Sequence, residues 1–70
     1  MSEISIRTRI QKLQQDIDRI EKSIEQKEAL LLQGINDELA FLTRSDIREL
    51  RSESIIIKNQ ILNLKKQYNG

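Results

Sequence analysis

The stretch LLLQGINDELAFLTRSDIREL, Leu30 to Leu50, decides how this chain folds, because it separates two long runs of regularly spaced isoleucines and leucines. The chain has 70 residues and no proline, and Gly34 is its only internal glycine. Almost nothing therefore interrupts a helix along the chain. The stretch must determine where one helix ends and the next begins.

Apolar residues before this stretch recur in alternating steps of four and three. This heptad pattern is typical of helices that pack knobs into holes, and it predicts a helix from about residue 4 to 33. One polar residue, Lys27, falls in the same series, and we expect it to reach Glu49 or Glu53. The apolar seam of this helix is Ile6, Ile10, Leu13, Ile17, Ile20, Ile24 and Leu31.

Gly34 follows the last seam residue and predicts the end of the first helix. A glycine there can adopt the left-handed conformation, and Ile35 could then fold back onto Leu30. The alternative is one continuous helix through Gly34, which would cost only about 1 kcal/mol.

The second helix has two candidate starts. Thr43 with Asp46 resembles a capping box, and Leu42 could pack against Ile47 as a hydrophobic staple, so we expect a connector over 34–42 and a helix from about 43 to 68. The rival reading starts the helix at Asp37 and runs it unbroken. The seam of the second helix, which also contains Ser54 and Tyr68, is Ile47, Leu50, Ile57, Ile61 and Leu64.

Two amphipathic helices joined by a short connector bury their seams against each other, which predicts one all-α domain over 1–70, an antiparallel helical hairpin of coiled-coil type. The chain has no cysteine and no histidine, so neither disulfides nor zinc can support so small a core. The second helix also carries apolar residues off its seam. We therefore expect a homodimer, an antiparallel four-helix bundle, with a second interface at Ile55, Ile56 and Leu62.

Charge is distributed unevenly along the expected hairpin. At the open end, residues 1–15 and 55–70 carry a net +5, and residues 16–54 carry a net −4. Two hairpins packed head to tail would oppose these dipoles, which favours a bundle with its turns at opposite ends.

Enzymatic chemistry is not expected. The usual acid–base and nucleophilic residues, histidine and cysteine, are absent. Glu21, Glu25 and Glu28 share one helix face without any accompanying ligand, and Gly34 alone makes no phosphate-binding loop. We expect no cofactor and no metal.

The sequence instead predicts a cytoplasmic protein-interaction module, a small adaptor, regulator or inhibitor that binds itself and an unidentified protein, and no membrane. Phe41 and Leu39 are candidate anchors for that partner, and the alternative for Phe41 is that it packs over the ends of both helices. One alternative is a helical dimer that binds nucleic acid, and another is a structural element of a larger complex. The candidate phosphate contacts of the first alternative are Arg7, Arg9, Lys12, Lys65 and Lys66.

Overall fold

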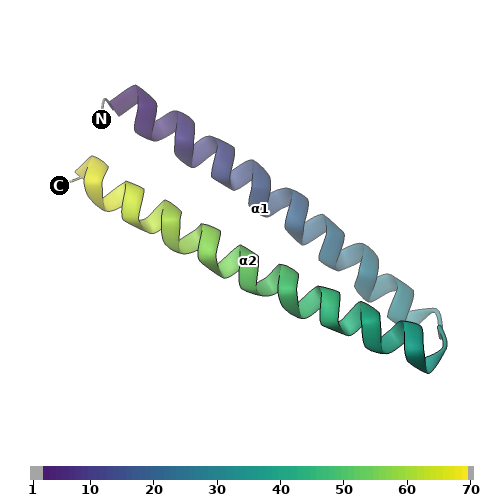
Figure 1. The fold of residues 1–70 in the computed structure, drawn as a ribbon. Coiled ribbons are helices and arrows are strands. Elements are labelled where there is room, and N and C mark those ends of the chain that lie inside the picture. Colours follow the sequence, from purple (N-terminus) through teal and green to yellow (C-terminus); the bar gives the residue numbers. More distant parts are fainter. Residues whose placement is uncertain (1–2, 70) are drawn as a thin grey trace.

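The protein is a hairpin of two long helices in the computed structural model (Figure 1), which describes the backbone of residues 3–69 and the side chains of residues 4–67. Helix α1 spans Glu3–Leu32 and helix α2 spans Asp37–Asn69. The helices run antiparallel and side by side, in a rod measuring 51 × 14 × 12 Å. Two helices packed against each other are what the heptad pattern predicts.

Helix α1 ends at the glycine that the sequence indicated. Gly34 has a φ of +78°, a left-handed conformation that residues with a Cβ rarely adopt. The Gln33 N–H donates to the Leu30 carbonyl at 3.1 Å, and the Gly34 N–H donates to the Leu31 carbonyl at 3.4 Å. These bonds satisfy carbonyls at the end of α1 that have no partner inside the helix.

Helix α2 begins at Asp37, so the prediction of a connector that lasts to residue 42 is wrong. Asn36 caps the helix: its Oδ1 accepts a hydrogen bond from the Leu39 N–H at 2.8 Å, and its carbonyl accepts one from the Ala40 N–H at 2.8 Å. Asp37 in the first turn adds negative charge where the helix dipole favours it. With its start already capped, α2 continues through Thr43 without a break.

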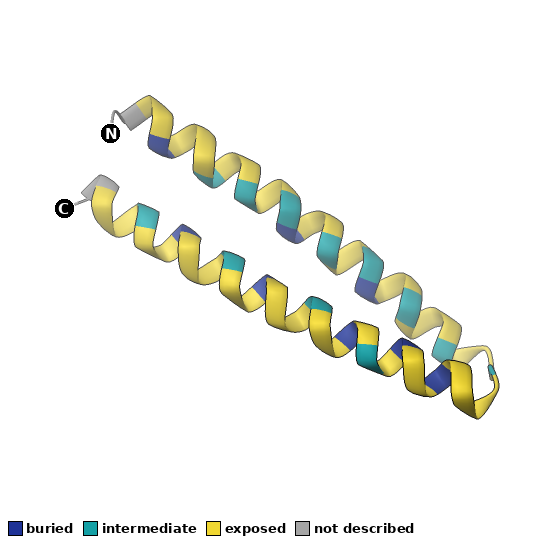
Figure 2. Ribbon diagram, in the orientation of Figure 1, coloured by how far each residue is buried: buried dark blue, intermediate teal, exposed yellow. Residues whose placement is uncertain are grey.

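The buried residues lie on the sides of α1 and α2 that face each other (Figure 2), and their side chains form the core of the hairpin. Every predicted seam residue whose side chain is described is buried or half-buried, and the side chain of Tyr68 lies outside the described range. On α2 the seam also extends toward the turn through Ala40 and Thr43, both buried, and Ser54 is buried farther along. Among the described side chains none is less than 2% exposed, so this core has solvent close to both of its edges.

Cross-helix ion pairs mark the register. Arg51 Nη2 lies 3.7 Å from Glu28 Oε2. Lys58 Nζ lies 3.7 Å from Glu21 Oε1, and this second pair is one heptad farther from the turn on both helices. The prediction that Lys27 reaches Glu49 or Glu53 is wrong. The Nζ of Lys27 instead lies 3.5 Å from Asp46 Oδ2. Asp46 is available for this pair since no helix begins at Thr43 for it to cap.

Candidate functional site

The most conspicuous surface of the hairpin is a row of exposed apolar side chains on α2. Phe41 is 68% exposed and Ile55 is 60% exposed, although each is large enough to fill a core position. Water contact with such side chains is unfavourable in proportion to their apolar area. We call this set the outer row, and its members are Phe41, Leu42, Ile55, Ile56 and Leu62.

The outer row lies on the side of α2 that faces away from α1. Its members stand one and two residues after the seam positions Ala40, Ser54 and Ile61, about 100° to 200° farther around the helix. The heptad period returns these positions to the same side of α2. Small polar residues at the centre of this side, Ser45, Ser52 and Asn59, separate its two apolar edges.

Phe41 belongs to this surface and not to the closed end of the hairpin. The reading in which it packs over the ends of both helices is wrong, because α2 is already helical at Phe41 and the ring is mostly in solvent. Leu42, 54% exposed, is equally inside α2 and cannot act as a staple before Ile47. Leu39 is exposed as well, one turn from the Asn36 cap.

Two charged residues interrupt the outer row at its middle. Arg48 and Glu49 are exposed and lie between the pair Phe41–Leu42 and the pair Ile55–Ile56. Among the described residues, the ion pairs within the chain involve neither of them. Both charges are therefore available to a group outside the hairpin.

The two sides of the outer row have opposite charge. Arg44, Arg48 and Arg51 follow the edge that carries Phe41 and Ile55, and we call this edge the basic flank. The other edge, which carries Leu42 and Ile56, is the acidic flank, and its charged members are Asp46, Glu49 and Glu53. The helical period assigns these sides, because residues three and four apart are neighbours on one side of a helix.

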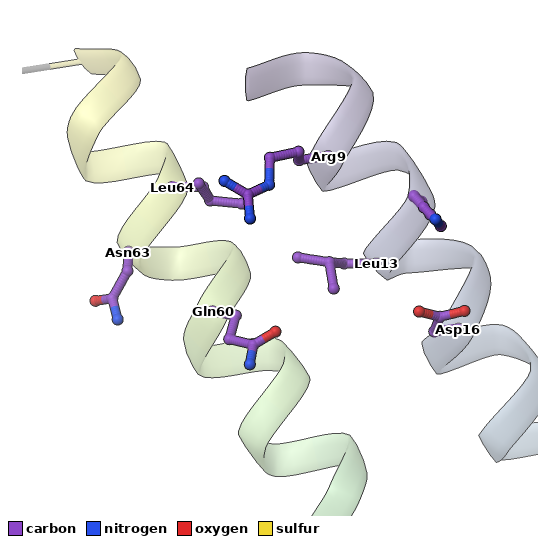
Figure 3. A pocket seen from close by; sticks show the side chains of 7 residues that line it. Arg9, Leu13, Asp16, Gln60, Asn63 and Leu64 are labelled. Carbon is purple, nitrogen blue, oxygen red and sulfur yellow. The ribbon is translucent and has the colours of Figure 1, made fainter. Parts of the chain in front are cut away.

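The candidate phosphate-binding residues do not gather on one face. Arg7 and Arg9 are two residues apart on α1, which sets them on nearly opposite sides of that helix. Arg9 lines an open groove between the helices and extends toward Leu64 (Figure 3), and Lys12 lines the same groove. Lys65 and Lys66 are exposed on α2, on neighbouring but different sides.

The carboxylates of α1 have structural partners or solvent. Glu21 and Glu28 pair with Lys58 and Arg51 across the hairpin, and Glu25 is exposed. Within the part of the chain that the structure describes, no three acidic side chains come together as a metal site would require.

The sequence pattern alone identifies three of the five members of the outer row. Ile55, Ile56 and Leu62 lie off the predicted seam, whereas Phe41 and Leu42 fall in the predicted connector. The signal that could have united them is the unbroken series of Ala40, Thr43 and Ile47 in steps of three and four, which continues the heptads back to the turn.

No protein-family model matches this chain, and neither the curated proteins nor the solved structures contain a significant match. Within residues 3–69, no helix is long and apolar enough to cross a membrane. The surface of the hairpin itself is what indicates its function.

Proposed function

We propose that this chain is a non-enzymatic protein-interaction module that works as a homo-oligomeric helical bundle, in the manner of a small adaptor, regulator or inhibitor. The observation that carries this proposal is the outer row of α2, which the hairpin leaves in water. Apolar residues scattered singly on a surface need no explanation, but five exposed ones on the same side of one helix favour an interface. A second protein surface on this row would remove it from solvent.

The thinness of the core supports the same proposal. One layer of seam side chains, with none of those described wholly buried, gives a chain of 70 residues little apolar burial. Chains of this size usually need a disulfide, a metal or association with another chain. Because cysteine and histidine are absent, we expect the chain to gain the missing stability by association with another chain.

Interaction modules of this kind act by presenting a rigid surface. A helix already ordered by its partner within the hairpin loses little conformational entropy when a second protein covers it. Leu39, exposed near the turn and outside the outer row, is the side chain that we assign to contact with an outside protein partner, whereas Phe41 lies within the self-association surface.

The solution mass tests the proposal directly. Sedimentation equilibrium at tens of micromolar should give about twice the 8.2 kDa chain mass, and the melting temperature should rise with protein concentration. Ile55→Lys should shift the mass toward the monomer, and Leu32→Lys, at a site 89% exposed on α1, should not. A monomer whose melting temperature is independent of concentration would refute self-association.

Binding of nucleic acid makes a different prediction for the open end. If phosphate contact were the function, RNA or DNA would be retarded at low salt, and neutralising Lys65 and Lys66 would reduce the salt dependence by about one unit per lost contact. An absence of retardation at low salt would exclude it. The scattered positions of the basic residues give this alternative no focused surface.

A further inference from the structure

The outer row of α2 has the chemistry of a surface that binds its own copy, and its charges specify how the two copies are oriented. We propose that two hairpins pack α2 against α2 in parallel and in register, with both turns at the same end of the dimer. This inference rests on the proposed self-association and adds its face and its direction.

The apolar residues define the face. Phe41 and Leu42 form one apolar layer at the turn end of α2, and Ile55 and Ile56 form a second layer two heptads later. In a parallel pair in register, each layer meets the same layer of the other copy. Ser52 and Asn59, both exposed, lie on the midline of this face, where two helices approach most closely.

Symmetry then determines which flanks meet. A two-fold axis along the helix direction sets the basic flank of each copy against the acidic flank of the other. An axis perpendicular to the helices sets like against like, with the Arg48 side of one copy facing the Arg48 side of the other. Arg51 and Asp46 already pair with α1 inside the hairpin, so the charges that decide are Arg48 and Glu49, and only the first arrangement sets these two against each other.

Arg48 and Glu49 provide the central contact of this arrangement. In the parallel pair, Arg48 of each copy faces Glu49 of the other, so the symmetry forms this contact twice. Neither residue has an ion-pair partner among the described residues of its own chain, so the contact costs the hairpin no internal pair. The apolar layers on either side exclude water from these charges and strengthen their attraction.

This orientation differs from the one expected from the end-to-end charge bias. That bias acts between groups spread along a rod 51 Å long, and salt screens charges separated by more than about 8 Å at physiological ionic strength. Charges on the flanks of α2 would instead meet directly across the contact. The short-range pattern therefore determines the direction of packing.

Single cysteines test the orientation, since the chain has none of its own. Ser52→Cys and Asn59→Cys, prepared separately and oxidised mildly, should each give a disulfide-linked dimer on a non-reducing gel. A parallel pair in register juxtaposes both positions with themselves, whereas any one antiparallel register can do so for at most one of them. Gln15→Cys, exposed on the outer side of α1, is the matched control and should remain unlinked.

Charge reversal tests the central contact. Arg48→Glu alone and Glu49→Arg alone should each weaken self-association by about tenfold or more, because like charges then face each other. Mixing the two variants should restore association as a heterodimer. Equal association by all three samples would show that these residues lie outside the interface.

The outcomes separate the two proposals. A wild-type chain that remains monomeric refutes self-association, and the outer row then belongs to a different protein. A wild-type dimer in which Ser52→Cys and Asn59→Cys do not both crosslink, or in which Gln15→Cys crosslinks as readily, refutes the parallel arrangement and leaves the interaction function in place.

Discussion

The Nζ of Lys27 lies 3.5 Å from Oδ2 of Asp46, and this pair joins a polar residue of the α1 seam to the first half of α2. Lys27 is 31% exposed and Asp46 is 57% exposed, so the pair is partly in water. Ion pairs of this kind contribute only about 0 to 1 kcal/mol. A lysine among isoleucines therefore selects the register of the two helices more than it stabilises the hairpin.

Lys27→Leu should consequently stabilise the hairpin, because an apolar side chain at this seam position buries more surface than the lysine stem. We expect the free energy of unfolding to rise by about 1 kcal/mol in urea denaturation. Asp46→Asn should lower it by less than about 1 kcal/mol. A clear loss of stability in Lys27→Leu would mean that the ion pair outweighs the packing.

Gly34→Ala tests the end of α1. A Cβ at this position meets no heavy atom within 4 Å, but the φ of +78° is strained for alanine. We expect a loss of about 1 to 2 kcal/mol in the free energy of unfolding, and a smaller loss for Gly34→Asn. Gln33→Ala, at the preceding residue, is the control and should change stability little. Equal stability of Gly34→Ala and the wild type would contradict the left-handed turn.

Asn36→Ala tests the start of α2. Loss of the side-chain acceptor for the Leu39 N–H should cost about 1 kcal/mol, measured by thermal or urea unfolding. Asn36→Asp keeps an acceptor at the same place and should remain close to the wild type. If α2 began at Thr43 instead, Asn36→Ala would have no effect.

The hairpin itself could be predicted from the sequence, because the local conformational preference of Gly34 and the packing of the isoleucine series both favour the same structure. The start of α2 could not be predicted in the same way. Thr43 and Asp46 imitate a capping box, yet Thr43 is buried in the seam. Small side chains at Ala40, Thr43 and Ser54 continue the seam without the bulk that makes a heptad visible. A local signal and the tertiary packing disagreed here, and the packing prevailed.

The same misreading divided the outer row. With Phe41 and Leu42 in the predicted connector, only Ile55, Ile56 and Leu62 suggest a second interface. Whether an apolar residue is exposed also depends on which face of its helix packs against the other helix. The heptad phase identifies that face only after the first and last residues of the helix are known. Our proposals for the partner and for the direction of packing depend on knowing which charged residues lie on each flank of the outer row.

Ile17→Asp tests the seam. Ile17 is buried against α2, so an aspartate there places a charge among apolar side chains at a cost of several kcal/mol. The same should hold for Ile57→Asp, at the half-buried seam residue of α2. We expect both variants to lose most of their helical circular-dichroism signal at 25 °C, and Leu32→Asp to keep it. A fully helical Ile17→Asp would contradict the packing described above.

Phe41→Ala distinguishes a surface residue from a core residue. A phenylalanine in a core would lose about 3 to 5 kcal/mol on truncation. At its exposed position on α2, we expect the stability of the isolated hairpin to change by less than about 1 kcal/mol, while the dissociation constant of self-association rises. Sedimentation equilibrium gives the second quantity, and Leu32→Ala, which should change neither, is the control.

The positions of the three cross-helix ion pairs between described side chains have a consequence for how quickly the chain can fold. Lys27–Asp46, Glu28–Arg51 and Glu21–Lys58 enclose progressively longer segments around one turn. Each pair that forms shortens the loop that the next pair must close, so the entropic barrier is met mainly once, at the turn. Cleavage between Gln33 and Asn36 would leave the cross-helix ion pairs in place but make folding a reaction between two molecules, whose rate falls as the protein is diluted.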